Sequence, residues 1–224
     1  MSWMALRPSS HFPQKPHDSP SWNLIVAVDV SRLPGLEKVR SLLTRLPLVP
    51  HPDHHLHVTL RYLGEAHCVK EQTLLGIKNI IAATPRWTAR VQNLHTFSTV
   101  VWADPDLTGK FADLTRRLLG PVGELPPDPR RHELVSHLTL GYANGYASQE
   151  EVQEALAPIA HTKLGTIEVE EVILTELSLD ASCSQWKIIR HFPLQENREH
   201  TKELTDEKTA GKSGKKRHVA QSEA

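Results

Sequence analysis

The spacing of apolar and polar residues in the first half of the chain predicts alternating strands and helices. An apolar run over Trp22 to Val30 predicts a buried strand, and apolar residues at helical spacing over Leu36 to Leu46 predict a helix. The segment LHVTLRYL around His57 predicts a second strand. A helix is expected next at Lys70 to Ala83, followed by a strand near Trp87 to Leu94.

The second half of the chain repeats this order. Ser98 to Asp104 predicts a strand, Leu107 to Gly120 a helix, and the segment LVSHLTLGY around His137 another strand. A helix follows at Ser148 to Ile159 and a strand at Thr166 to Leu179. The order strand, helix, strand, helix, strand therefore occurs twice, which is typical of a long-period internal repeat whose sequence identity has decayed.

Two related halves are expected to pack as two lobes about a pseudo-two-fold axis, with their central strands facing each other across a cleft. The predicted fold class is α+β and bilobal, with mainly antiparallel sheets and helices on the outer faces. One domain with a substantial core is expected over residues 21–194. Residues 1–20, rich in Pro and Ser, predict a disordered leader, and residues 195–224 predict a disordered charged tail.

The tetrapeptide His-x-Thr-Leu occurs in both central strands. Successive side chains of a strand point to opposite faces, so His57 and Thr59 share one face, as do His137 and Thr139. A single His-x-Thr is usually structural, with its imidazole bonded to a neighbouring carbonyl. Two copies in equivalent contexts favour acid–base chemistry on a small anionic group.

The two motifs differ at the position after the shared Leu. A period of two places Arg61 on the face of His57 and Thr59, where its guanidinium could bind phosphate. The alternative is an Arg at a strand end that reaches solvent. The matching residue of the second motif is Gly141, whose small size leaves room for a nucleobase or ribose.

Charge and cysteine content narrow the function classes. Lys plus Arg equals Asp plus Glu, at 26 each. The chain therefore has no net positive charge that would attract long nucleic acid through its phosphates. Recognition of an RNA end or a nucleotide stays open. Cys68 and Cys183 lie far apart and predict free thiols in a reducing compartment. With no apolar run long enough for a bilayer, we expect a cytoplasmic monomer without membrane contact.

Several other side chains compete for a functional role. His51, Asp53, His54, His55 and His57 crowd together and could be taken for a metal site, but the prolines between them indicate a loop, and no familiar ligand spacing is completed. No metal and no cofactor are therefore expected. Phe97, Trp102 and Tyr142 could stack on a base, although core packing is the interpretation favoured for Trp102. Trp186 is interpreted as a core residue of a terminal strand.

The motifs resemble a known superfamily. HLHVTLRYLGE (His55 to Glu65) and SHLTLGYANG (Ser136 to Gly145) are similar to the two signature motifs of the 2H phosphoesterases, and most closely to their 2′-5′ RNA ligase or RNA 2′,3′-cyclic phosphodiesterase branch. The opening strand, Leu63-Gly64 and the stretch Phe97 to Ala103 also have counterparts in that branch. The resemblance covers Trp22 to Leu194.

The resemblance implies a metal-independent phosphodiesterase that opens 2′,3′-cyclic phosphates at RNA ends or on nucleotides. His57 and His137 would be general acid and general base, in an order that the sequence does not assign, and Thr59 and Thr139 would hold phosphate oxygens. The expected product is a 2′-phosphate, with 2′-5′ ligation as the reverse reaction. Members of the branch often carry an Arg where this chain has Tyr142, a further candidate for substrate binding.

Two alternatives remain open at this point. The fold could serve as a nucleotide-binding module without turnover, although the intact His and Thr of both motifs favour an enzyme. The substrate could instead be a 2′-5′-linked oligonucleotide or an ADP-ribose cyclic phosphate.

Overall fold

The computed structural model describes residues 22–44, 48–97, 100–105, 107–127, 135–143, 147–178 and 186–196. The leader predicted at residues 1–20 lies outside the described residues, as does the predicted tail apart from Gln195 and Glu196. Gln195 still belongs to the fold, because its backbone N–H donates to the Thr84 carbonyl at 2.9 Å. No helix in the described part of the chain is long and apolar enough to cross a membrane.

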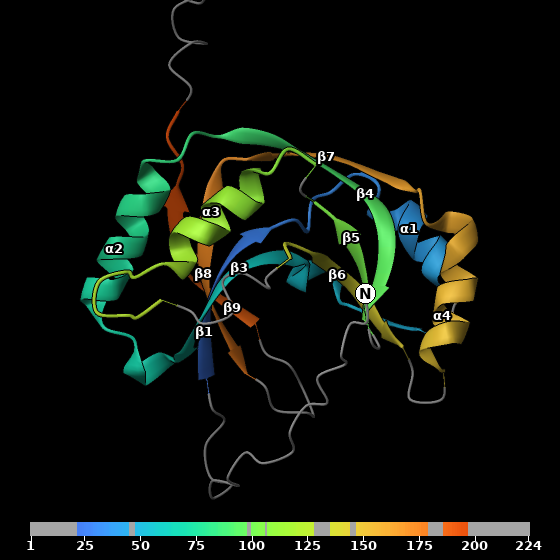
Figure 1. Cartoon of the computed structure of the whole chain (residues 1–224), viewed down its shortest axis with the longest axis horizontal. Helices are drawn as coiled ribbons and strands as arrows, with labels where there is room; N and C mark the ends of the chain where they lie inside the picture. Colours follow the sequence, from blue (N-terminus) through green and yellow to red (C-terminus); the bar gives the residue numbers. More distant parts are fainter. Residues whose placement is uncertain are drawn as a thin grey trace, which may run out of the picture.

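The described strands form one mainly antiparallel sheet (Figure 1), which confirms the predicted α+β class. Its order is β7-β4-β5-β6-β3-β1-β8-β9, with β2 paired to β6. The strand bounds are β1 (Trp22–Asp29), β2 (Leu48–Pro50), β3 (His57–Glu65), β4 (Trp87–Phe97), β5 (Val100–Asp104), β6 (Leu138–Ala143), β7 (Lys163–Val169), β8 (Glu171–Ser178) and β9 (Trp186–Pro193).

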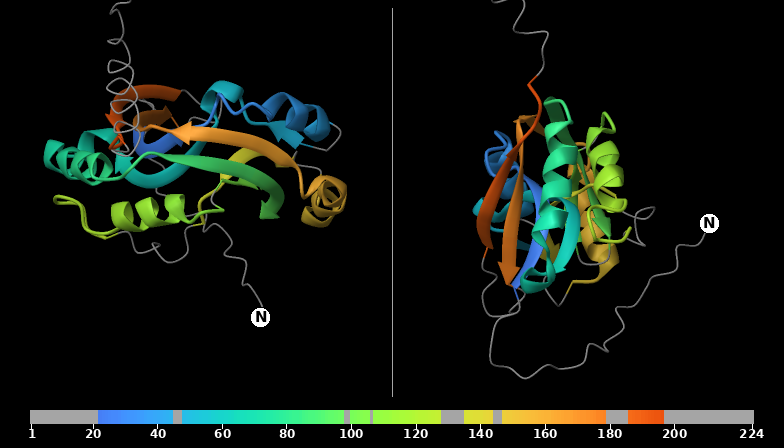
Figure 2. Two further views of the ribbon diagram at one scale, coloured as in Figure 1. Left: turned by 90° about the horizontal axis from the view of Figure 1, so that it is seen from above. Right: turned by 90° about the vertical axis from the view of Figure 1, so that its left-hand side faces the viewer.

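The helices fall into two pairs, one for each lobe of the sheet. Helices α2 and α3 lie together against the lobe built from β3, β1, β8 and β9, as the right-hand view of Figure 2 shows, whereas α1 and α4 lie against the other lobe. The helix bounds are α1 (Leu36–Leu43), α2 (Glu71–Ala82), α3 (Lys110–Leu119) and α4 (Gln149–Leu156), with short 3₁₀ turns η1 (Asp53–His55), η2 (Ala66–Cys68) and η3 (Ala157–Ile159).

Each half of the sequence lends one strand to the other lobe. Strand β4 follows α2 in the chain but pairs with β5, and β8 follows α4 and β7 but pairs with β1. The two lobes are thus β3-β1-β8-β9 and β6-β5-β4-β7, joined where β3 meets β6. The exchange makes the two halves of the chain a single folded unit.

The sequence led us to expect that the motif strands face each other across a cleft, but they do not. They are neighbours at the centre of one sheet, where Val58 of β3 pairs with Leu138 of β6. Both residues are fully buried and belong to the main apolar core. The other face of β1 carries a smaller cluster in which Ile25 and Ala27 pack with Trp186. This second face carries the candidate site.

Candidate functional site

The two His-x-Thr motifs meet at the junction between the lobes. His57 begins β3, and His137 directly precedes β6. The pair formed by Val58 and Leu138, the residues between His and Thr in each motif, is antiparallel. The sequence repeat therefore becomes a local two-fold arrangement centred on this pair.

The register predicts which histidine works with which hydroxyl. In an antiparallel ladder, the residues flanking a pair on one strand lie opposite those flanking it on the other. His57 accordingly lies toward Thr139, and His137 toward Thr59. The four side chains predicted from sequence are brought together in one place, each imidazole beside the threonine of the neighbouring strand.

Both imidazoles are held in the same orientation by the same backbone contact. The Nδ1 of His57 lies 2.6 Å from the carbonyl oxygen of His55, and the Nδ1 of His137 lies 2.8 Å from that of Val135. A carbonyl only accepts, so Nδ1–H must be the donor in each ring. In the neutral form, Nε2 is then left without a proton and can accept one.

Burial sets the charge state of His57. Removal of water is the main reason why the pKa of His57 falls from 6.5 to about 4. The hydrogen bond to His55 opposes this shift, whereas repulsion by the charged forms of His51, His137 and His55 adds to it. His57 is therefore a neutral imidazole near pH 7, with a free Nε2 lone pair.

A β-bulge interrupts the alternation of β3 at the last residue of the motif. On β1, the neighbours Val26 and Ala27 pair with Arg61 and Thr59, so that Leu60 is the extra residue. A bulge turns the following side chain to the opposite face of the sheet. Leu60 and Arg61 are consequently both buried on the helix-covered side.

The expectation that Arg61 shares the face of His57 is wrong, because of this bulge. The Arg61 guanidinium instead donates to the carbonyls of Leu118, Gly120 and Pro126, the latter two at 2.7 Å. The Leu118 and Gly120 carbonyls lie at the C-terminal end of α3, where backbone acceptors have no partners within the helix and a cation is favoured. Arg61 thus joins β3 to the end of α3.

The second motif contains an equivalent bulge. On β5, Val101 and Trp102 pair with Gly141 and Thr139, so that Leu140 is the extra residue of β6. Both copies of the motif therefore share a backbone irregularity as well as a sequence. Bulges beside functional sites change the direction in which side chains point. We infer that the two bulges help to shape this site.

The space beside Gly141 is not open to a ligand, contrary to the sequence-based expectation. Strand β2 runs along β6 there, with Pro50 paired to Gly141. A Cβ at Gly141 would lie 2.9 Å from the Val49 carbonyl oxygen. Glycine is thus needed for the close approach of two backbones.

After each bulge, a tyrosine returns to the face of the site. Tyr62 pairs with Ile25 and Thr59 with Ala27, and those two β1 residues share one face of the sheet. The Tyr62 hydroxyl donates to Oδ1 of Asn23. The longer pattern His-x-Thr-Leu-x-Tyr thus describes the first motif better than alternation does.

Tyr142 holds the equivalent position in the second motif. It pairs with Val100, and Thr139 pairs with Trp102, two residues further along the same strand. The Tyr142 ring is 45% exposed and lies 6.0 Å, centroid to centroid, from that of His51. Partial burial raises the pKa of Tyr142, so its hydroxyl stays protonated as a donor near neutral pH.

Other aromatic rings surround the two histidines. Trp186 lies 4.4 Å from His57, and His51 lies 6.1 Å from it. Neither residue was expected at the catalytic site, because Trp186 lies in an apolar strand and His51 in a proline-rich loop. Only tertiary contacts bring the two residues to His57. Strand β9, which carries Trp186, pairs with β8, and the backbone N–H of His51 donates to the Leu140 carbonyl at 2.9 Å.

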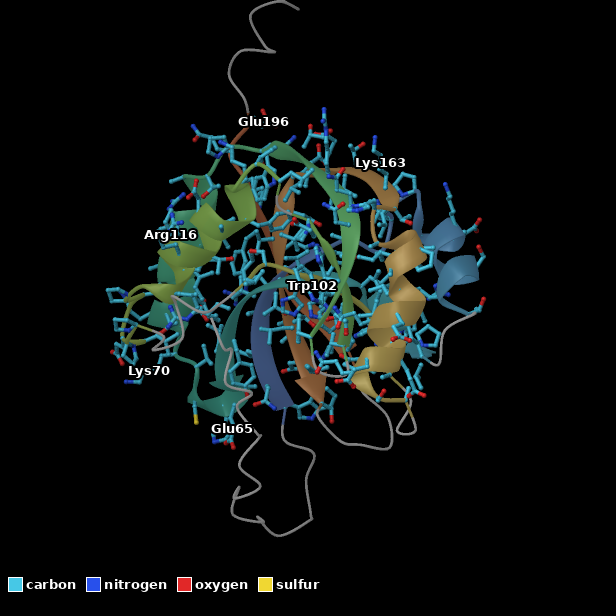
Figure 3. The ribbon with its side chains drawn as sticks, turned by 45° about the vertical axis from the view of Figure 1, so that its right-hand side comes forward. Glu65, Lys70, Trp102, Arg116, Lys163 and Glu196 are labelled. Atoms are coloured by element: carbon cyan, nitrogen blue, oxygen red, sulfur yellow. The ribbon has the colours of Figure 1, made fainter. Side chains whose placement is uncertain are left out.

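The His137 side has its own aromatic neighbours. Phe97, which is 43% exposed, lies 5.4 Å from His137, and Trp102 lies 6.1 Å from it. His95 stacks on Trp102 at 4.6 Å. Trp102 is labelled near the middle of the view in Figure 3, and Arg116 near its edge. Because Trp102 pairs with Thr139, it lies on the same face of the sheet as that threonine. Trp102 is partly buried, and Phe97 is the more accessible ring.

The metal-ligand alternative receives no support from the described histidines. Among the residues that the structure describes, a group of three or more potential ligand atoms within 4.8 Å of one another occurs only at Glu65, His67 and Cys68. That group contains none of the histidines between residues 51 and 57. Of the two cysteines, Cys68 is free and exposed, and Cys183 lies outside the described residues.

Solved structures share this fold. E. coli LigT complexed with NADP+ is 19% identical, with a TM-score of 0.58 over 79% of this chain and 99% of that chain. E. coli LigT complexed with ATP is 17% identical, with a TM-score of 0.53 over the same shares. TT0787 of Thermus thermophilus is 18% identical, with a TM-score of 0.57 over 79% and 100%. At these identities the likeness is one of fold.

A family model identifies the chain more closely. No curated protein matches the sequence. The model described as the 2′-5′ RNA ligase superfamily matches residues 28–180, which include both His-x-Thr motifs and well over half of the chain. The resemblance drawn from the two motifs is confirmed, and the chain belongs to the 2′-5′ RNA ligase superfamily within the 2H phosphoesterases.

Proposed function

We propose that this protein hydrolyses 2′,3′-cyclic phosphates at RNA ends or on nucleotides and releases 2′-phosphates. The observation that carries the proposal is the matched pair of imidazoles, His57 and His137. Each donates Nδ1–H to the carbonyl two residues earlier in the chain, so that Nε2 is free for proton transfer. Opening a cyclic phosphate needs one group to accept a proton and another to supply one.

His57 is the general base in this mechanism. Its lowered pKa keeps it neutral near pH 7, and a neutral imidazole can accept a proton from water. The water oxygen attacks phosphorus, and its proton moves to the His57 Nε2. Because the hydrogen bond to His55 holds the other ring nitrogen, the accepting nitrogen stays aimed in one direction.

His137 is the general acid. A general acid that acts through Nε2 must begin the step as an imidazolium, with protons on both ring nitrogens. As the bond between phosphorus and O3′ breaks, protonated His137 gives its Nε2 proton to the departing oxygen and keeps the Nδ1 proton that it donates to Val135. The product carries a 2′-phosphate and a free 3′-hydroxyl, and the two histidines have exchanged protonation states. Proton return through solvent resets them. If the 5′-hydroxyl of another RNA takes the place of water, its oxygen attacks phosphorus, the bond to O3′ breaks, and the product is a 2′-5′ phosphodiester, the linkage for which the superfamily is named.

Thr59 and Thr139 hold the phosphate. Each hydroxyl lies toward the histidine of the neighbouring strand, so a phosphate between the imidazoles meets a donor on either side. Hydrogen bonds to charged oxygens are stronger than neutral ones. With Arg61 engaged by α3, these hydroxyls and the Tyr142 hydroxyl are the phosphate donors that we assign.

The aromatic surroundings favour a nucleotide over a simple cyclic phosphate. Phe97 and Tyr142 are partly exposed rings near His137 and His51, and aromatic side chains bind unstacked bases. Crystal structures of E. coli LigT, which has this fold, include complexes with ATP, 3′-AMP and NADP+ as well as one with phosphate. Those complexes support a nucleotide-type ligand for this chain.

The test is direct. The protein is incubated in EDTA with the four 2′,3′-cyclic nucleoside monophosphates and with an oligonucleotide ending in a cyclic phosphate, and the product isomer is identified by chromatography. We expect 2′-phosphates and no loss of rate with EDTA. The His57→Gln and His137→Gln variants are the controls. Binding of nucleotides without turnover by the wild type would instead favour a binding module.

A further inference from the structure

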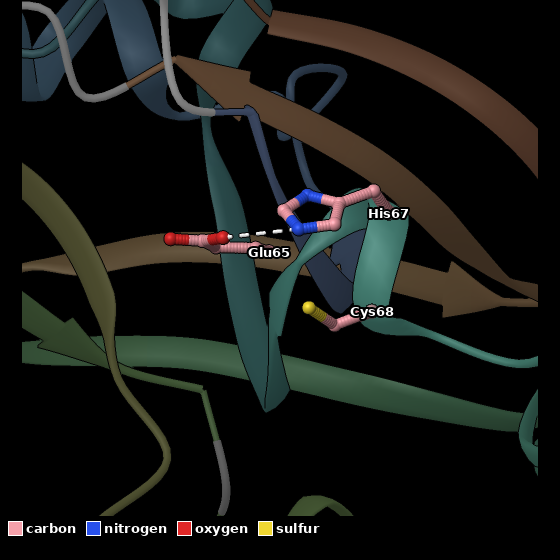
Figure 4. A group of neighbouring side chains, drawn as sticks. All are labelled: Glu65, His67 and Cys68. Carbon is pink, nitrogen blue, oxygen red and sulfur yellow. Dashed lines mark ion pairs between the residues drawn. The ribbon is translucent and has the colours of Figure 1, made fainter.

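We propose a second site that nothing in the catalytic assignment uses: a surface site for a zinc-type divalent metal, formed by Glu65, His67 and Cys68. Their ligand atoms, one from each residue, all lie within 4.8 Å of one another. Oε2 of Glu65 and Nε2 of His67 are 3.4 Å apart. Figure 4 shows the carboxylate, the imidazole and the thiol turned toward a common point.

The local backbone explains why these three side chains converge. Gly64 has a φ of 90°, a left-handed value that bends the end of β3. The strand ends at Glu65, and the 3₁₀ turn η2 follows directly, with the Val69 N–H donating to the Ala66 carbonyl at 3.3 Å. Side chains three residues apart eclipse each other in such a turn, which places Glu65 and Cys68 on one side. The group is therefore held by backbone geometry rather than by mutual attraction alone.

The donor set selects the class of metal. A thiolate and an imidazole suit Zn²⁺ and its usual substitute Co²⁺, whereas Mg²⁺ and Ca²⁺ prefer oxygen ligands. Bonds of about 2.0–2.3 Å to a tetrahedral ion place ligand atoms about 3.3–3.7 Å apart. Oε2 of Glu65 and Nε2 of His67 already have this spacing, at 3.4 Å. A small rotation of the exposed Cys68 side chain brings its Sγ to the same spacing. Three protein ligands leave the fourth position for water or for a ligand from a partner.

This site is separate from the proposed phosphodiesterase centre. Glu65 and His57 are the opposite ends of β3, and a nine-residue strand spans roughly 26 Å at about 3.3 Å per residue. A metal at Glu65 therefore cannot reach the scissile bond. The two proposals fail or succeed independently, because one is tested by metal binding and the other by turnover in EDTA.

Cobalt titration of the full chain under a non-thiol reductant tests the site. A thiolate bound to Co²⁺ gives a strong near-ultraviolet charge-transfer band, which histidine-only sites lack. We expect this band in the wild type and in Cys183→Ser, the matched control for the other thiol. Cys68→Ser should abolish the band, and Zn²⁺ should displace Co²⁺ and bleach it.

The other two ligands are tested by affinity. His67→Gln and Glu65→Gln should each weaken Co²⁺ binding at least about ten-fold, since even outer-shell changes at metal sites cost ten-fold or more. All three residues lie at the surface, and circular dichroism checks that each variant is folded. A charge-transfer band that persists in Cys68→Ser, no band in the wild type at millimolar Co²⁺, or unchanged affinity in both Gln variants would overturn the proposal.

Discussion

At the scale of single residues, the charge state of His57 matters most to the proposed chemistry. Its imidazole is neutral near pH 7 because burial and nearby histidines disfavour the charged form. The acid limb of kcat/KM should therefore fall near pH 4 rather than near 6.5, the ordinary pKa of histidine. Steady-state rates between pH 3.5 and 8, on a substrate with no titration in that range, measure this limb. A limb near 6.5 would argue against His57 as the base.

The same lowered pKa makes stability depend on pH. The unfolded chain binds the His57 proton more tightly than the folded chain does, so stability must fall as pH drops from 6.5 toward 4 and level off below. Urea unfolding of the wild type and of His57→Gln isolates this effect. We expect the wild type to lose stability relative to the variant between pH 7 and pH 4.5. A constant difference would mean that the imidazole is solvated.

The threonine hydroxyls can be removed without changing side-chain shape. Thr59→Val and Thr139→Val should each lower kcat/KM by about one to two powers of ten, because a hydrogen bond to a charged oxygen is worth about 1.5–3 kcal/mol. Thr166→Val, at an exposed position of β7, is the control and should have no effect. Wild-type rates in both motif variants would show that the phosphate is held elsewhere.

At the scale of elements, sequence periodicity predicted the four helices and most strands of the described residues. It missed β2, merged β7 and β8 into one strand at Thr166 to Leu179, and did not reveal the bulges. Alternation places Thr59 correctly and Arg61 wrongly, since the extra residue between them is visible only in the pairing with β1. The repeated His-x-Thr-Leu-x-Tyr pattern holds the missing information in retrospect. Tyr62 and Tyr142 recur at the same offset because both strands bulge after the shared Leu. A propensity scale has no term for such a feature.

The bulge leads to a prediction for Arg61. Replacing it with Met removes the donors that serve the Leu118, Gly120 and Pro126 carbonyls. Leaving buried acceptors without partners should lower the free energy of unfolding by about 1–3 kcal/mol. Urea unfolding measures this loss, while kcat/KM at low temperature should stay near the wild-type value. If Arg61→Met has wild-type stability but loses activity, the result would indicate that Arg61 binds the phosphate instead of supporting α3.

At the scale of the whole molecule, the exchange of strands between lobes was the least predictable feature. The internal repeat indicated two lobes, and two lobes are present. Local sequence, however, does not state that β4 pairs with β5 and β8 with β1, because such pairings depend on contacts between distant segments. The pairing of β3 with β6 is likewise a contact between distant segments, and it makes the motif strands neighbours in one sheet instead of walls of a cleft.

The exchange predicts that the two lobes unfold together. Gly35 begins the turn into α1, and a Cβ there would lie 1.8 Å from the Leu164 carbonyl oxygen on β7. Gly35→Ala should therefore cost about 1–3 kcal/mol through overpacking in that lobe. Strand β8 follows β7 directly in the chain but pairs in the other lobe. We therefore expect amides of β1 and β8, in the lobe without the substitution, to lose the same free energy of protection in hydrogen exchange.

Gly120→Ala is the matched control, because its Cβ would meet the nearest neighbouring atom at an ordinary 3.4 Å. It should leave amide protection in both lobes unchanged. Loss of protection confined to α1 and β7 in Gly35→Ala would show that the lobes open independently. Equal loss across β1, β3 and β8 would instead mean that the site, which lies where β3 meets β6, keeps its geometry only while both lobes are folded.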